Sequence, residues 1–169
     1  MILRAAALSL AALALSACAT VPAGQHAAAL PDAAPFDAQA DASADLAAAL
    51  AAAELTDRKV LAVFGANWCH DSRALAGWLE SPRFQALTES AYKIVYIESG
   101  VPQTGKGRNL DLAAQYGVSD IKGTPTMLAL GADGTLLNTP EDARSWRNAA
   151  SRSEGEIEAW LTRWTGTSA

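Results

Sequence analysis

Cysteine is scarce in this chain of 169 residues, which contains only Cys18 and Cys69. Two cysteines provide neither a disulfide framework nor a four-cysteine zinc site. Histidine is equally rare, because His26 is the only histidine besides His70. Metal binding through Cys69 and His70 therefore lacks further ligands, and we expect neither a metal nor another cofactor.

Positive charge is also in short supply. The chain has 13 basic and 18 acidic residues and a net charge of −5. Because a phosphate backbone would be repelled, we expect no nucleic-acid partner. Hydrophobic residues make up 50% of the chain, which excludes a protein disordered throughout, and the length suits one domain.

The hydrophobic run at the N-terminus is too short to span a membrane. Residues 5–15 are alanine and leucine, interrupted only by Ser9. A run of about 11 residues is well below the roughly 20 that a membrane-spanning helix needs. Since Arg4 precedes the run, we predict a signal peptide over residues 1–17.

The run ends in the sequence LSAC at residues 15–18. These residues resemble the lipobox of bacterial lipoproteins, which implies cleavage before Cys18 and acylation of its sulfur. The resemblance implies a lipid-anchored protein of the bacterial cell envelope that faces the periplasm, and Ala19 favours the outer membrane. An ordinary signal peptide cut near Ala17 or Ala19 is the alternative.

Residues 18–42 are predicted to be the lipidated N-terminus and a disordered tether, because they contain almost no large apolar residue. The folded domain is predicted over residues 43–169. Ser43 is expected to cap its first helix, whose apolar stripe would consist of Leu46, Leu50 and Leu55.

Strands and helices alternate along the predicted domain. Residues 59–66 and 92–97 have the composition of buried strands, and residues 126–138 that of a hairpin with an Asp-Gly turn. Helices are predicted over residues 71–80, 83–90 and 109–116 and after Ser153. This order predicts an α/β sandwich with a mixed sheet covered on both faces. Helical spacing places Trp78, Trp160 and Trp164 in the core, whereas Trp146 stays unassigned.

Two motifs flank the predicted strands. The sequence WCHDS at residues 68–72 lies between a buried strand and a helix, and GTPT at residues 123–126 precedes another strand. Together they resemble the WCxxC site and the cis-proline loop of the thioredoxin superfamily. The resemblance implies a three-layer α/β/α sandwich with an added N-terminal helix, and a backbone at Thr124 that pairs with a substrate peptide. It also implies a cis peptide before Pro125 and a substrate surface made of Trp68, His70, Thr124 and Pro125.

The predicted position of Cys69 at the start of a helix favours a reactive thiolate. Unpaired N–H groups and the helix dipole stabilise a thiolate there, so we expect an exposed, catalytic sulfur. Ser72 is expected to assist by donating a hydrogen bond to that sulfur. An inert buried cysteine is the alternative for Cys69, and a proline that merely starts an edge strand is the alternative for Pro125.

The chain departs from the thioredoxin pattern at three places. Ser72 stands where the family has its second active-site cysteine, and Val63 where it has a buried acid. Dithiol cycling is therefore excluded. Long segments at residues 100–108 and 118–124 are expected to reshape the groove near the site.

The leading hypothesis is a lipid-anchored thioredoxin-like protein that exchanges protein thiols and disulfides through Cys69. The CxxS motif resembles variants found among disulfide isomerases. A substrate thiol, a small thiol or a partner reductase would release the mixed disulfide. The rival hypothesis is a non-catalytic binding or chaperone module that keeps the cis-proline groove.

Overall fold

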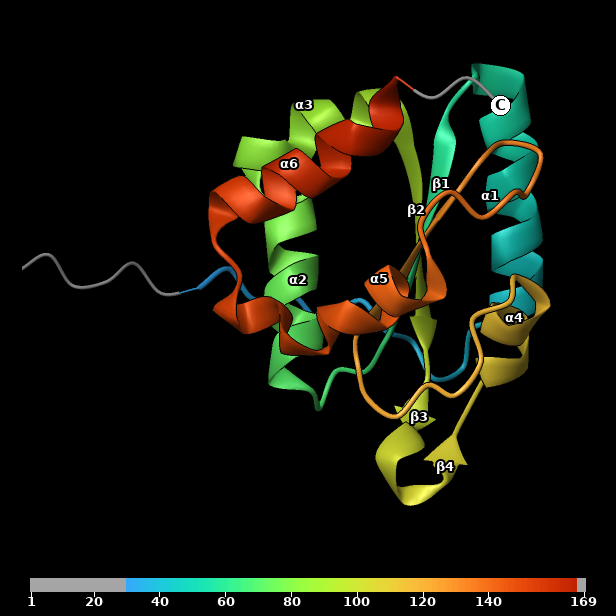
Figure 1. Cartoon of the computed structure of the whole chain (residues 1–169), viewed down its shortest axis with the longest axis vertical. Helices are drawn as coiled ribbons and strands as arrows, with labels where there is room; N and C mark the ends of the chain where they lie inside the picture. The colour runs from blue at the N-terminus through green and yellow to red at the C-terminus, as the bar shows by residue number, and fades with distance from the viewer. Residues whose placement is uncertain (1–29, 167–169) are drawn as a thin grey trace, which may run out of the picture.

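A mixed sheet of three strands lies at the centre of the fold (Figure 1), in a computed structural model that describes residues 30–166. The strand order is β2-β1-β5, with β1 over Lys59–Gly65, β2 over Tyr92–Glu98 and β5 over Thr126–Leu130. Strand β2 runs parallel to β1, and β5 runs antiparallel to it. Every residue of β1 is buried, because β1 has a neighbour on each edge and helices on each face.

The register of the sheet brings two distant segments together. Phe64, near the end of β1, is paired with Thr126 at the start of β5. The chain that leaves β1 and the chain that enters β5 therefore lie side by side at the same end of the sheet. These are the two segments that carry the predicted cysteine and proline motifs.

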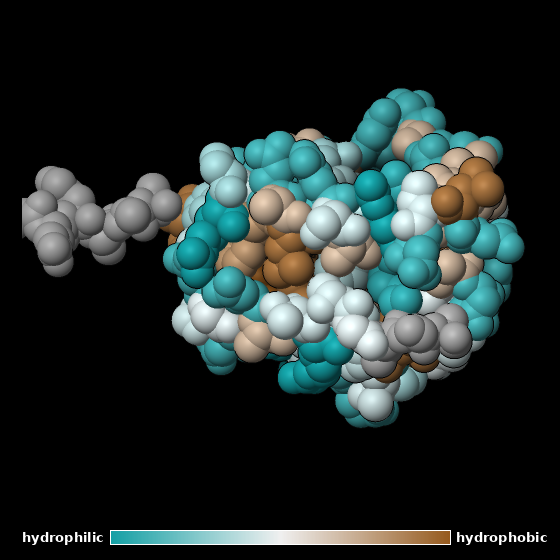
Figure 2. Space-filling view, turned by 90° about the horizontal axis from the view of Figure 1, so that it is seen from above, coloured by the Kyte–Doolittle hydropathy of each residue, from teal (hydrophilic) through white to brown (hydrophobic). Residues whose placement is uncertain are grey.

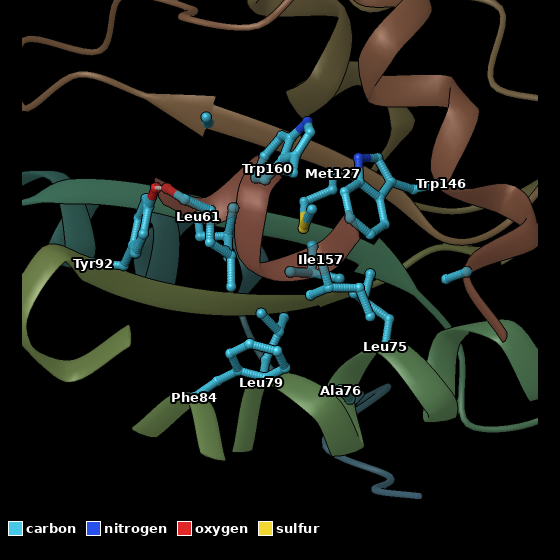
Figure 3. Close-up of a cluster of buried hydrophobic side chains, with 14 of the residues drawn as sticks. Leu61, Leu75, Ala76, Leu79, Phe84, Tyr92, Met127, Trp146, Ile157 and Trp160 are labelled. Carbon is cyan, nitrogen blue, oxygen red and sulfur yellow. Dashed lines mark hydrogen bonds between the residues drawn. The ribbon is translucent and has the colours of Figure 1, made fainter. Parts of the chain in front are cut away.

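The first face of the sheet is covered by α2 over His70–Glu80, α3 over Pro82–Ala91, η2 over Ser145–Ser151 and α6 over Glu154–Thr165. Trp146 is fully buried here, and its ring meets that of Trp160 edge to face at 5.1 Å. Figure 3 shows both rings beside Met127 of β5. Trp160 is buried, and Trp78 and Trp164 pack partly buried against this core, as predicted. Trp146, which sequence left unassigned, is therefore a core residue.

The opposite face is covered by α1 over Ala42–Thr56 and α4 over Leu110–Gln115, with α5 over Pro140–Arg144 contributing Ala143. The expected cap at Ser43 is wrong, since the Asp41 side chain caps α1 by accepting a hydrogen bond from the Ala44 amide at 3.0 Å. Leu55 is 87% exposed rather than part of the apolar stripe. It lies nine residues after Leu46, and at about 100° per residue it points to the far side of the helix.

Together these layers form the predicted α/β sandwich, with a mixed sheet and helices on both sides.

The expected hairpin after β5 is only half formed. Its turn is present, but the returning segment pairs with β5 through one isolated bridge, between Leu130 and Leu136. The Asn138 side chain accepts a hydrogen bond from the Ala129 amide at 2.9 Å and donates one to the Met127 carbonyl at 3.0 Å. The Asn138 side chain thus forms hydrogen bonds with β5 that a returning strand would otherwise form. The chain then leaves the sheet and enters α5.

The long segment at residues 100–108 forms a small hairpin. Strand β3 spans Gly100–Val101, η1 spans Pro102–Thr104 and β4 spans Lys106–Gly107. This hairpin projects from the end of the molecule to which β2 leads (Figure 1).

Within residues 30–166, no helix combines the length and the apolar character needed to cross a membrane. The face seen in Figure 2 is mostly hydrophilic, with separate apolar spots rather than one continuous apolar surface.

Candidate active site

Cys69 lies at the N-cap of α2, in the turn that follows β1. Its backbone is extended, with φ −86° and ψ 121°, and its amide donates to the Ala66 carbonyl at 3.0 Å. The first amides of a helix have no partner within the helix, so they and the helix dipole favour negative charge at this position. The predicted place of Cys69 at a helix N-terminus is therefore confirmed.

The sulfur of Cys69 is covered by the loop before β5. The peptide between Thr124 and Pro125 is cis, as predicted. The Cys69 thiol donates to the Thr124 carbonyl, with Sγ and oxygen 3.3 Å apart. Cys69 is only 8% exposed, so the expected exposed sulfur is wrong. The antiparallel pairing of β5 with β1 holds this loop directly over the N-terminus of α2.

Ser72 is fully buried one helical turn after Cys69. Its hydroxyl has no hydrogen-bond partner in the part of the chain that the structure describes, so the expected bond to the Cys69 sulfur is absent. A Cβ atom on Gly65 would lie 2.9 Å from this hydroxyl oxygen and 2.5 Å from the Phe36 ring. The second position of the motif is therefore closed off from solvent by β1 and Phe36.

Trp68 and His70 form the exposed rim of the site. Trp68 is 51% exposed, and its indole N–H donates to the Gly100 carbonyl at 3.1 Å, which ties it to the β3–β4 hairpin. His70 is exposed at the start of α2. The Asp71 carboxylate instead accepts from the Ala150 amide at 2.9 Å and links α2 to η2.

A segment that sequence assigned to the tether packs against the site. Residues 30–41, here called the N-terminal strap, precede α1. Phe36 is 2% exposed and meets the Tyr96 ring edge to face at 5.4 Å. Its amide donates to the Asn67 side-chain oxygen at 3.1 Å, and the Asn67 side-chain nitrogen donates to the Phe36 carbonyl at 2.9 Å. The strap therefore holds the residue directly before the Trp-Cys pair.

The strap continues along α2. The Ala33 amide donates to the Arg73 carbonyl at 3.1 Å, and the Arg73 guanidinium pairs with Asp32 at 3.1 Å. A Cβ on Gly77 would lie 2.4 Å from the Asp32 amide nitrogen, so the close approach of strap and helix needs glycine there. Within the described residues, the segment expected to be a disordered tether up to residue 42 is thus attached to the domain. One aromatic residue in a segment rich in Ala, Pro and Asp was too weak a signal to predict this.

The interior behind the site is neutral. Val63 is fully buried opposite Met127, so no acid stands at this point of β1. Burial raises the pKa of Tyr96 far above its usual value, and the Glu80 carboxylate raises it further. Tyr96 therefore remains an uncharged phenol beside Phe36.

Within residues 30–166, no three His, Cys, Asp or Glu side chains are grouped so that they could hold a metal ion. Cys18, His26 and the predicted signal peptide lie outside the described residues.

Comparison with known proteins identifies a family and a similar solved structure. Residues 41–132 match a protein family described as thioredoxin-like. The crystal structure of a disulphide isomerase from Xylella fastidiosa Temecula1 is 33% identical in sequence and superimposes with a TM-score of 0.67. The match covers 78% of this chain and 96% of that chain. No curated protein matches the chain at a significant level.

The strap makes a prediction for stability. Replacing the fully enclosed Phe36 ring (Phe36→Ala) should lower the free energy of unfolding by about 3–5 kcal/mol, because it leaves a cavity between α2, β1 and β2. Urea denaturation followed by tryptophan fluorescence measures the loss.

Leu30→Ala is the matched control, since Leu30 belongs to the same segment but is 41% exposed. It should cost less than about 0.5–1 kcal/mol. Equal and small losses for both variants would mean that the strap is not part of the core.

Proposed function

The chain belongs to the thioredoxin-like family, and on that basis we propose that it performs thiol–disulfide exchange through Cys69 alone. A role in thiol–disulfide exchange is supported by the family and by the disulphide isomerase to which the structure is similar. The single-thiol mechanism is our own inference from the site.

The observation that carries the proposal is the position of the Cys69 sulfur. It lies at the N-terminus of α2 and 3.3 Å from the carbonyl of Thr124, the residue before the cis-proline. A substrate that pairs its backbone with this loop would bring its disulfide to the sulfur. The exposed Trp68 ring forms the adjacent wall.

The first chemical step forms a mixed disulfide. The Cys69 thiolate attacks one sulfur of the substrate disulfide, so a bond between Cys69 and that sulfur forms as the substrate S–S bond breaks. The second substrate sulfur leaves as a thiolate and takes up a proton. No net oxidation or reduction occurs, because one disulfide replaces another.

The thiolate that releases the substrate must come from outside the motif, since Ser72 supplies no second thiol. Another thiolate attacks the substrate sulfur of the mixed disulfide, and Cys69 leaves as a thiolate. If that thiolate belongs to the same substrate, the outcome is isomerisation. If it belongs to a small thiol or a partner reductase, the substrate is carried toward reduction.

The low exposure of Cys69 favours a second candidate function. A cysteine that is only 8% exposed suits a binding module whose cis-proline groove holds clients without chemistry. In that case Cys69→Ser would leave client binding unchanged. In the exchange mechanism Cys69→Ser removes all turnover.

We further propose that the protein is a lipoprotein anchored through Cys18, facing the periplasm at the outer membrane. The support is the LSAC sequence at the end of the short hydrophobic run and the alanine that follows it. The strap begins at Leu30, so residues 19–29 would connect the anchor to the domain.

Restoring a second thiol is expected to convert the site. Ser72→Cys places a thiol one helical turn from Cys69, within the range of Cα separations that disulfides span. We expect the variant to close a 69–72 disulfide under oxidising conditions and to reduce insulin severalfold faster than the wild type in the presence of a dithiol. Mass spectrometry after thiol labelling and insulin turbidity measure the two effects.

The double variant Cys69→Ser/Ser72→Cys is the control, because it has a thiol at position 72 but none to attack substrate. It should show no gain in insulin reduction. If Ser72→Cys keeps both thiols free under oxidising conditions, the alignment of residues 69–72 with the dithiol motif is refuted.

The anchor is tested by growing cells that express the full chain with labelled palmitate. We expect label in the wild type and none in Cys18→Ala, because acylation needs the Cys18 sulfur. Cys69→Ala should be labelled like the wild type. A mature protein without label that begins elsewhere would rule out the anchor.

A further inference from the structure

A hollow of about 340 Å³ lies beside the cis-proline loop. It includes Gly123 and Thr126, the residues on either side of the Thr124–Pro125 peptide. The remaining lining consists of five charged residues and a serine, namely Asp120, Lys122, Glu141, Arg144, Ser145 and Arg147. Because the Cys69 sulfur contacts the Thr124 carbonyl, a substrate attached to that sulfur would lie next to this hollow.

The charges of the hollow do not cancel. Lys122 pairs with Asp120 at 3.3 Å, and Arg144 pairs with Glu141 at 3.1 Å. Arg147 makes no ion pair with any residue that the structure describes. The hollow therefore carries one uncompensated positive charge, in a chain whose net charge is −5.

Arg147 is placed where a substrate chain would pass. Its Cβ and Cδ atoms lie 3.4 and 3.6 Å from the point that a Cβ on Gly123 would occupy, so the arginine stem lies over the cis-proline loop. Helix η2, which carries Arg147, is fixed to the first turn of α2 by the bond from the Ala150 amide to Asp71. The guanidinium and the catalytic thiol are thus held on elements that are bonded to each other.

We propose that Arg147 selects peptide substrates that carry a carboxylate next to the cysteine that Cys69 attacks. This inference rests on the proposed exchange function and names the class of substrate for that same site. A guanidinium binds a carboxylate through two parallel hydrogen bonds, a geometry that lysine does not offer. The two neighbouring cations are already paired, so Arg147 is the group available to a ligand.

The experiment compares two peptide disulfides that differ only in having glutamate or glutamine on both sides of the cysteine. The rate of mixed-disulfide formation at Cys69 is followed by intact mass. For the wild type we expect the glutamate peptide to react about two- to fivefold faster, the range of a partly exposed ion pair. The preference should shrink in about 1 M salt, where charges are screened within about 3 Å.

Variants at Arg147 separate this inference from general charge effects. Arg147→Gln should remove the preference and Arg147→Glu should reverse it, with little change in the rate for the glutamine peptide. Arg163→Gln makes the same charge change on α6, outside the hollow, and should keep the wild-type preference.

Two outcomes overturn the inference while leaving the exchange function intact. One is an equal wild-type rate for both peptides, and the other is an unchanged preference in Arg147→Gln. A preference for oxidised glutathione over bis(2-hydroxyethyl) disulfide, without one among the peptides, would overturn the assignment to peptide substrates. Failure of the wild type to react with any of these disulfides would instead overturn the proposed function, and this inference with it.

Discussion

The antiparallel pairing of β5 with β1 is the constraint on which the site depends. It sets Thr126 opposite Phe64, so the cis-proline loop lies over the turn that leads into α2. In this register the Thr124 carbonyl lies 3.3 Å from the Cys69 sulfur. The helices on both faces bury β1 completely and so fix the strand from which the turn departs. Cys69 thus owes its surroundings to residues more than fifty positions away in the sequence.

The residues behind Cys69 are consistent with the one-thiol chemistry proposed above. Ser72 is enclosed by Gly65 of β1 and by Phe36 of the strap, and Val63 leaves the strand beside it without an acid. A resolving cysteine and the acid that would serve it are both replaced, so the two changes are consistent with each other. In the proposed mechanism exchange ends only when a thiol from outside the motif attacks, so the choice of that thiol controls the outcome.

Much of the fold and the centre of the site could be predicted because the signals are local. A buried β-branched run, a Trp-Cys pair before a helix and a Thr-Pro pair before a strand each occupy a few adjacent residues. Three of the errors came from contacts between residues that are not adjacent in the sequence. Phe36 is the single aromatic residue of the strap, and only its contact with Tyr96 and the bonds to Asn67 show its role. The Asn138 side chain bonds to β5 where a second hairpin strand was expected. Cys69 is buried by the loop before β5, which comes from a distant part of the chain.

The central claim is that Cys69 forms a mixed disulfide that the protein cannot resolve by itself. The most direct measurement exposes the full chain to excess peptide disulfide, removes the excess and records intact mass over time. The account predicts one peptide adduct, located at Cys69 and absent in Cys69→Ser, that persists until a thiol is added. An adduct that disappears without added thiol, or no adduct at all, would contradict the account.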